Sequence, residues 1–78
     1  MNIKIISPEK EVYQGEVTLV QLPGIDGLFE ILENHAPIIS VLKQGKIRLI
    51  TPLKKEEIID INSGVIECSN NNIQILIQ

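Results

Sequence analysis

The sequence predicts an all-β protein: a compact β-sandwich or flattened barrel of about 7 to 10 short strands with no substantial helix. Three observations lead to this prediction. Turn-forming residues recur every few positions, the segments between them are short and rich in β-branched residues, and several segments alternate apolar with polar side chains. No window has the periodicity of a helix of three turns. At 78 residues, the chain is expected to form a single domain, residues 1–78.

Turns separate the expected strands along the whole chain. Their residues are mainly Gly, Pro, Asn, Asp and Ser, which favour the backbone angles of turns. The expected turns are SPEK (7–10), QG (14–15), PGIDG (23–27), ENHAP (33–37), KQGK (43–46), TPLKKEE (51–57), NSG (62–64) and SNNN (69–72).

Two segments in the first half of the chain indicate how strands are placed. EVTLVQL (16–22) is apolar at both odd and even positions, which predicts a strand covered on both faces or one that crosses between sheets at a bend. A strand over 28–32 would direct Glu30 away from Phe29 and Ile31, because successive side chains point to opposite faces.

The second half contains the clearest alternation. GKIRLI (45–50) sets Ile47 and Leu49 against two basic residues. IQILIQ (73–78) follows the same rule, with its isoleucines facing one way and its glutamines sharing the other face with Leu76. Both patterns predict strands with one buried face.

Composition excludes several function classes. A net charge of −3, one Arg and two aromatic residues disfavour nucleic-acid binding. No apolar run reaches the ~18 residues of a membrane span, and the N-terminus lacks a signal peptide pattern, so we expect a soluble, cytoplasmic chain. The single cysteine permits no internal disulfide and fits a reducing compartment. A chain this small needs an efficient aliphatic core or a partner that covers part of its surface.

The segment GLFEILENHAP (27–37) contains the only Phe and the only His of the chain. Glu30, Glu33 and His35 could form a weak, open metal site or an acid–base centre. The favoured interpretation is structural: a solvated strand face leads into a turn in which Asn34 tolerates unusual backbone angles and His35 hydrogen-bonds the loop backbone. We therefore expect no metal and no catalytic residue here.

Other chemically suggestive residues also have structural interpretations. Cys68 lies between strand residues and is expected to fill core volume. The glycines of PGIDG (23–27) lack the following helix that phosphate binding needs, so the segment is interpreted as a tight turn. Lys54 and Lys55 are expected at a charged hairpin tip. Their alternative function is that of a modified lysine on a lipoyl- or biotinyl-type carrier domain, although the residues typical of that setting are absent.

The order of the segments resembles the N-terminal β-sandwich domain of the epsilon subunit of F-type ATP synthases. The resemblance covers essentially the whole chain. It rests on four markers in order: a Gly, an Asn-His-Ala-Pro segment, a G-x-I-R strand and a Ser-Gly-Val turn. Here the markers are Gly27; Asn34, His35, Ala36 and Pro37; Gly45, Lys46, Ile47 and Arg48; and Ser63, Gly64 and Val65.

The resemblance implies a mechanical role without catalysis or a cofactor. Such a subunit connects the gamma shaft to the ring of c subunits on the cytoplasmic face of the bacterial cell membrane, as a peripheral protein that couples ion flow to ATP synthesis. Carried over by position, the gamma contacts would be Ser7, His35 and Ser40, and the ring contacts Asp26, Gly27 and Leu28.

Two departures from the family pattern lead to further expectations. Members often place a carboxylate directly after the glycine of the ring-contacting turn, where this chain has Leu28. We therefore expect Asp26 to supply the charge and Leu28 to pack against the ring. Members typically continue into a two-helix arm, whereas this sequence stops at Gln78. If that is the whole chain, the arm and any nucleotide site that depends on it are missing, and no ATP binding is expected.

Overall fold

The computed structural model describes all 78 residues and contains nine strands and no helix. It therefore contains no helix long and apolar enough to cross a membrane. The strands are β1 (Asn2–Ile6), β2 (Glu11–Glu16), β3 (Leu19–Gly24), β4 (Gly27–Leu32), β5 (Ile38–Leu42), β6 (Gly45–Ile50), β7 (Glu56–Ile61), β8 (Gly64–Ser69) and β9 (Asn72–Ile77).

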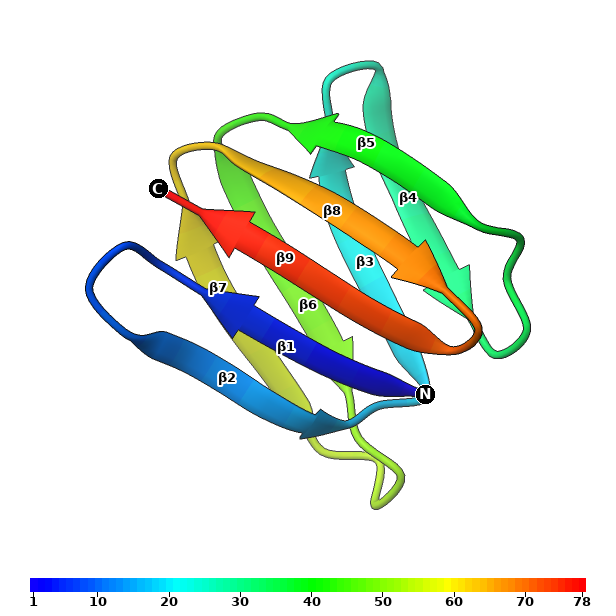
Figure 1. Ribbon diagram of the computed structural model, residues 1–78. Helices are drawn as coiled ribbons and strands as arrows, with labels where there is room; N and C mark the ends of the chain where they lie inside the picture. The colour runs from blue at the N-terminus through cyan, green and yellow to red at the C-terminus, as the bar shows by residue number, and fades with distance from the viewer.

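The strands form two packed layers (Figure 1). The front layer has the order β2-β1-β9-β8-β5, and the back layer has the order β4-β3-β6-β7. Every pair is antiparallel except β1 with β9. The two layers join where β5 meets β3, and only Gly24 and Leu42 are in register there. The predicted all-β class, with two curled layers and no helix, is confirmed.

The core lies between the layers and is made of aliphatic side chains at every second strand position. In β9, Ile73, Ile75 and Ile77 are buried while the residues between them are exposed, as the alternation predicted. In β6, Ile47 and Leu49 are fully buried, also as predicted. No polar or charged side chain is buried, so the core is held by apolar burial.

The segment 16–22 crosses between the layers. Glu16 ends β2 in the front layer, Leu19 begins β3 in the back layer, and Val17 between them is fully buried. The crossing explains why apolar residues occur at both odd and even positions of this segment. Of the two interpretations of the sequence, the crossing at a bend is correct.

Several expected turns are shorter in the structure, because end residues of PGIDG, KQGK, NSG and SNNN belong to the flanking strands, and two further turns differ as follows. QG (14–15) lies inside β2, where Gly15 pairs with Ile3 in an ordinary ladder. The predicted tip TPLKKEE is shorter than expected, because Glu56 pairs with Ile50 and continues the β6–β7 ladder. In both places strand pairing overrides the local turn preference.

The strand directions give the sandwich two ends. The Ser7 end carries the loop 7–10, the turn of Ile25 and Asp26, the loop 43–44, the turn of Asn62 and Ser63, and Gln78. The Met1 end carries Met1, the crossing at 17–18, the segment 33–37, the loop 51–55, and the turn of Asn70 and Asn71.

Candidate functional site

The outer face of the front layer is apolar toward the Ser7 end. Val41 pairs with Val65, and Val65 pairs with Leu76, so three apolar side chains from three strands lie in one row. Each is 42% to 51% exposed, and Ile39 beside them is 73% exposed. Sheet faces that meet only water usually carry polar residues at such positions. This row is therefore a candidate contact surface.

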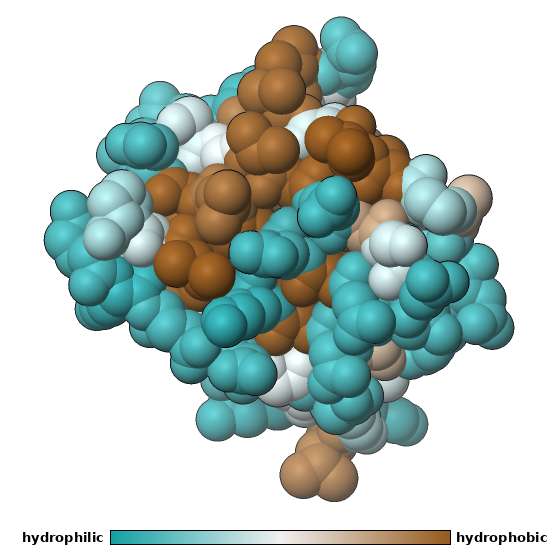
Figure 2. Space-filling model, viewed as in Figure 1, coloured by the Kyte–Doolittle hydropathy of each residue, from teal (hydrophilic) through white to brown (hydrophobic).

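The apolar surface continues onto the β3–β4 turn. Ile25 and Leu28 are 58% and 69% exposed, and an open groove lies between this turn and β5. Figure 2 shows the resulting apolar area over the upper part of the front face. We call this surface the apolar patch and define it as Ile25, Leu28, Ile39, Val41, Val65 and Leu76.

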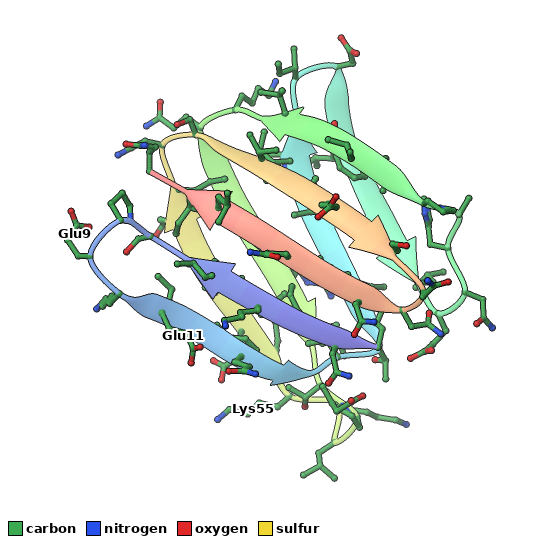
Figure 3. All side chains as sticks on the ribbon, viewed as in Figure 1. Glu9, Glu11 and Lys55 are labelled. Carbon is green, nitrogen blue, oxygen red and sulfur yellow. The ribbon has the colours of Figure 1, made fainter.

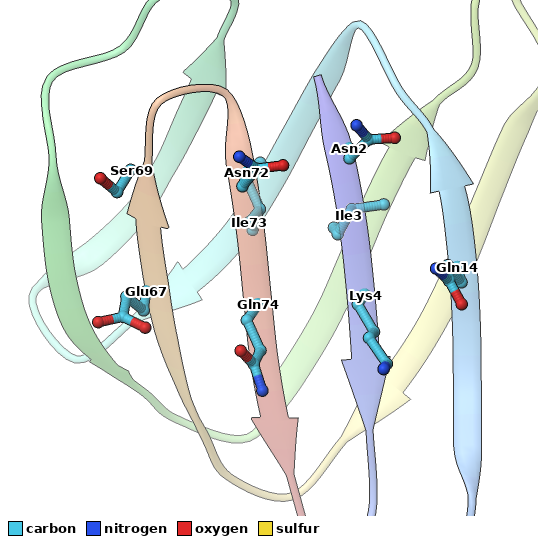
Figure 4. A pocket seen from close by; sticks show the side chains of 9 residues that line it. All are labelled: Asn2, Ile3, Lys4, Gln14, Glu67, Ser69, Asn72, Ile73 and Gln74. Carbon is cyan, nitrogen blue, oxygen red and sulfur yellow. The ribbon is translucent and has the colours of Figure 1, made fainter.

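The same face is polar toward the Met1 end. Figure 4 shows this part, where side chains from β1, β2, β8 and β9 form a shallow hollow. Glu67 pairs with Gln74, and Gln74 pairs with Lys4, in the row next to the apolar one. The polar residues of this part are Asn2, Lys4, Gln14, Glu67, Ser69, Asn72 and Gln74. The face thus changes from apolar to amide-rich and charged along the strands.

The groove brings together both kinds of contact residue inferred from the resemblance. It is lined by Asp26, Gly27 and Leu28 from the β3–β4 turn and by Ser40 from β5. Asp26 is exposed and forms no ion pair within the chain. Gly27 has φ +130°, a conformation that favours glycine. Ser40 is half-buried on the inner side of β5.

Ser7 and His35 lie at opposite ends of the front layer. The Ser7 hydroxyl accepts a hydrogen bond from the Lys10 N–H at 3.2 Å and closes the β1–β2 loop. The His35 N–H donates to the Leu32 carbonyl at 3.2 Å, and its Nδ1 lies 2.6 Å from the Ala36 carbonyl oxygen. The predicted hydrogen bond from His35 to the loop backbone is confirmed.

The His35 loop is tied to the β8–β9 turn through two asparagines. Asn34 adopts φ +65°, as expected of Asn, and its N–H donates to Asn71 Oδ1 at 2.7 Å. Asn71 Nδ2 donates back to Asn34 Oδ1 at 3.2 Å. Ala36 and Pro37 complete the exposed end of this loop.

The remaining marker residues support the scaffold. A side chain at Gly45 would meet Pro23 Cβ at 2.8 Å, and one at Gly64 would meet the Leu76 carbonyl oxygen at 2.9 Å. Arg48 forms an ion pair with Glu56 across β6 and β7. The Ser63 carbonyl accepts a hydrogen bond from the Gln78 N–H at 3.0 Å.

The three residues considered for a metal or acid–base site contact separate partners. Glu30 accepts a hydrogen bond from Gln21 Nε2 at 3.3 Å, Glu33 pairs with the Met1 ammonium group, and His35 contacts Ala36. No group of three His, Cys, Asp or Glu side chains in the structure could hold a metal ion.

Cys68 lies in the core, as predicted, with 2% of its surface exposed. Burial raises the pKa of its thiol, which keeps the sulfur in the unreactive protonated form. Lys54 and Lys55 lie in the loop between β6 and β7, also as predicted.

The contacts of the N-terminal ammonium group could not be predicted from the sequence. The Met1 ammonium donates hydrogen bonds to the Glu33 carboxylate, to the Val17 carbonyl at 3.1 Å and to the Glu16 carboxylate at 3.5 Å. The hydrogen bond to Glu33 is the main cause that raises the pKa of this amine above its usual value of 8.0, and burial opposes it. The ammonium group thus fastens the beginning of the His35 loop to β1.

This contact predicts a loss of stability at alkaline pH. Because the folded pKa is raised, the stabilisation is fully present below the unfolded pKa near 8.0 and is lost as the pH rises through the folded pKa. Thermal melts between neutral pH and about pH 10 should show the melting temperature falling more for the wild type than for Glu33→Gln. Ionisation of Cys68 in the unfolded state also lowers the melting temperature at alkaline pH, but it does so equally in the wild type and in Glu33→Gln. If the melting temperatures of the two proteins fell in parallel with pH, the prediction would be contradicted.

Comparison with known sequences identifies the family. A family model described as "ATP synthase, Delta/Epsilon chain, beta-sandwich domain" matches residues 1–78. The ATP synthase epsilon chain of Chlorobium limicola is 43% identical over 74 residues, which cover 95% of this chain and 84% of that protein. The epsilon chain of Helicobacter pylori (strain ATCC 700392 / 26695) is 42% identical over 76 residues, which cover 97% of this chain but 61% of that protein.

Solved structures show the same fold at low sequence identity. A chain in the Euglena gracilis mitochondrial ATP synthase superposes with a TM-score of 0.90 at 14% identity, covering 96% of this chain and 48% of that one. A chain in the central stalk and c-ring structure of the Tetrahymena thermophila mitochondrial ATP synthase gives a TM-score of 0.84 at 15% identity. The match covers 100% of this chain and 63% of that one. Sequence and fold agree, and the chain belongs to the family of ATP synthase delta/epsilon chain β-sandwich domains.

Proposed function

We infer that this chain is the non-catalytic central-stalk subunit of a rotary ATP synthase, connecting the gamma shaft to the c-subunit ring. The observation that carries this conclusion is the family match over residues 1–78. The two similar folds come from ATP synthase assemblies in which the central stalk or F1 is present together with the c ring. The subunit thereby couples transmembrane ion flow to ATP synthesis.

We propose that gamma binds the outer face of the front layer. Ser7 and His35 lie at the two ends of this layer, and Ser40 lies on its outermost strand β5 with its side chain in the groove beside the β3–β4 turn. The apolar patch supplies the desolvated centre that a lasting interface needs, and the neighbouring polar residues supply a hydrogen-bonding rim.

We propose that the c ring contacts the β3–β4 turn. Leu28 is 69% exposed and offers apolar contact, while the unpaired Asp26 offers a charge for a polar or basic ring loop. Ile25 and Leu28 of this turn region belong to the apolar patch, so both partners would bind one continuous surface.

The core suits a part that transmits torque. Sixteen buried apolar residues form one cluster between two crossing layers. Close-packed interiors have low compressibility, so a load applied to one layer passes to the other with little deformation. We also propose that residues 1–78 act as one domain and that it lies on the cytoplasmic face of the bacterial membrane.

The test uses one variant for each partner. Val65→Asp should weaken binding to purified gamma at least about 100-fold, because an unpaired carboxylate buried in an apolar contact costs several kcal/mol. Asp26→Lys should weaken binding to the detergent-solubilised c ring, most strongly at low salt where charges are least screened. Each variant should bind the other partner as the wild type does.

Ile58→Asp is the matched control. Ile58 is 52% exposed, like the patch residues, but lies on β7 in the back layer. The Ile58→Asp variant should bind gamma and the c ring with the affinity of the wild type. Equal losses with Val65→Asp and Ile58→Asp would contradict the gamma assignment, and an Asp26→Lys protein with unchanged ring affinity at every salt concentration would contradict the ring assignment. A wild-type protein that bound neither partner would contradict the proposed function.

A further inference from the structure

The loop 33–37, which carries His35, is tied to two other segments of the chain. The Asn34 N–H donates to Asn71 Oδ1 at 2.7 Å, and Asn71 Nδ2 donates to Asn34 Oδ1 at 3.2 Å. The Asn2 N–H donates to the Asn71 carbonyl at 2.9 Å. Figure 3 shows side chains of the loop and of the β8–β9 turn gathered at the right of the view, opposite the labelled Glu9. Asn71 therefore joins the loop to the β8–β9 turn and to the start of β1.

The β8–β9 turn has asparagine at two positions where glycine would be less strained. Asn70 and Asn71 adopt φ values of +52° and +61°, a left-handed conformation that glycine reaches without strain. The Asn70 side chain forms no hydrogen bond, whereas the Asn71 side chain bonds the loop. The two residues share a backbone conformation and differ in this contact, so the connection to the loop is specific to Asn71.

The loop holds one nitrogen of the His35 ring and leaves the other available. Nδ1 lies 2.6 Å from the Ala36 carbonyl oxygen, which can only accept, so Nδ1 carries the proton. Nε2 forms no hydrogen bond within the chain, and no buried nitrogen or oxygen atom of a side chain lacks a partner, so Nε2 is accessible to solvent. In the neutral ring, Nε2 is therefore a hydrogen-bond acceptor.

The hollow beside the His35 ring is polar and uncharged. The residues that line it are Asn34, His35, Pro37, Asn70 and Asn71. Glu33, which precedes the hollow in the chain, is paired with the Met1 ammonium group. A partner group that enters here meets hydrogen-bonding atoms and no free charge, so recognition depends on the direction in which each donor and acceptor points.

We propose that Asn71 is a positioning residue for gamma binding: by holding Asn34, it fixes the loop so that His35 Nε2 accepts a hydrogen bond from a donor group on gamma. This role rests on the proposed function, because His35 is a proposed gamma contact. A loop that already has its bound arrangement loses less conformational entropy when the partner binds. Asn71 thereby raises the affinity for gamma through His35 rather than by a contact of its own.

The first experiment compares two glycine substitutions in one turn. Asn71→Gly removes both side-chain hydrogen bonds and should weaken binding to purified gamma roughly tenfold, the effect of losing two hydrogen bonds of ordinary strength. Glycine accepts the left-handed backbone, so the turn should keep its conformation. Asn70→Gly is the matched control and should bind gamma as the wild type does. Both variants should keep wild-type affinity for the c ring, since the β3–β4 turn lies at the other end of the sandwich.

Two further variants separate positioning from direct contact. In a His35→Ala background, Asn71→Gly should cause no additional loss of gamma affinity, because Asn71 acts through His35. Asn71→Asp retains an acceptor oxygen for the Asn34 N–H, so it should restore most of the affinity that Asn71→Gly loses.

Nitrogen-15 NMR observes the ring directly, because His35 is the only histidine of the chain. The spectra are recorded at mildly alkaline pH, where histidine side chains are neutral, with only this chain labelled. In the free wild type, Nδ1 should be protonated and Nε2 unprotonated, and Nε2 should stay unprotonated when gamma binds. In Asn71→Gly the signals of the two nitrogens should move toward each other as the ring exchanges between arrangements.

Three results would overturn the proposal: equal gamma affinity of Asn71→Gly and Asn70→Gly, additive losses from Asn71→Gly and His35→Ala, or protonation of Nε2 in the complex. Failure of the proposed function is distinct. The wild type would then bind neither gamma nor the c ring, while the ring nitrogens of the free protein would still differ between the wild type and Asn71→Gly.

Discussion

Replacing Ile75 by Ala is expected to lower the melting temperature by roughly 8 to 40 °C. Ile75 is fully buried at the centre of the front layer, in register with Ile5 on β1 and Ile66 on β8, which are also fully buried. Truncating a buried isoleucine costs about 2–5 kcal/mol, and each kcal/mol shifts the melting temperature of a domain this small by about 4–8 °C. The total stability expected for 78 residues is only about 4–12 kcal/mol.

The neighbouring residue provides the control. Leu76 is 51% exposed on the opposite face of the same strand, so Leu76→Ala should change the free energy of unfolding by less than about 1 kcal/mol. It should instead weaken binding to gamma, because Leu76 belongs to the apolar patch. Chemical denaturation followed by far-ultraviolet circular dichroism measures both variants. Similar destabilisation by the two substitutions would contradict the assignment of the core and outer faces.

Local patterns predicted the strands because burial of one face imposes its own period on the sequence. The alternation in 45–50 and 73–78 predicted which side chains enter the core, and the apolar residues at both odd and even positions of 16–22 indicated the crossing at Val17. These predictions needed only neighbours in sequence. They held because the hydrophobic contribution of each buried position exceeds the backbone preference of the residue that occupies it.

The candidate site depends on contacts that no local pattern contains. Val41, Val65 and Leu76 come from three strands and form one row only through the register of β5, β8 and β9. The only local sign of this apolar surface in the sequence was Leu76, because it lies on the otherwise polar side of its strand, together with glutamines. The contact of the Met1 ammonium with Glu33 is likewise set by long-range pairing.

The same register explains the turns that were misplaced. A Gln-Gly or Glu-Glu segment is free to turn when considered alone, but residues 14–15 and 56–57 continue strand pairing already begun by their neighbours. Turn residues therefore mark where a strand can end, and cross-strand pairing decides where it does end.

Replacing Gly24 by Ala is expected to destabilise the protein by about 1–3 kcal/mol and to weaken binding to the c ring. Gly24 is buried where the two layers join, in register with both Leu42 and Gly27. An added Cβ would lie 2.8 Å from the Gly27 carbonyl oxygen and 2.8 Å from the Phe29 ring. The phenyl ring of Phe29 can rotate away, but the Gly27 carbonyl belongs to the turn that carries Asp26. Relieving the contact with this carbonyl therefore displaces the turn.

The same substitution at Gly15 should have the opposite sign. A Cβ there would lie 3.6 Å or more from the Tyr13 side chain, an ordinary contact, and the backbone is extended. Gly15→Ala should therefore stabilise the protein by about 0.4–1 kcal/mol by reducing the entropy of the unfolded chain. For Gly24→Ala, denaturation curves measure the loss of stability, and binding to the c ring is measured separately on the folded protein. If Gly24→Ala lost stability but kept full ring affinity, the turn would be able to accept the displaced carbonyl, and the β3–β4 turn would not depend on the layer junction for its position.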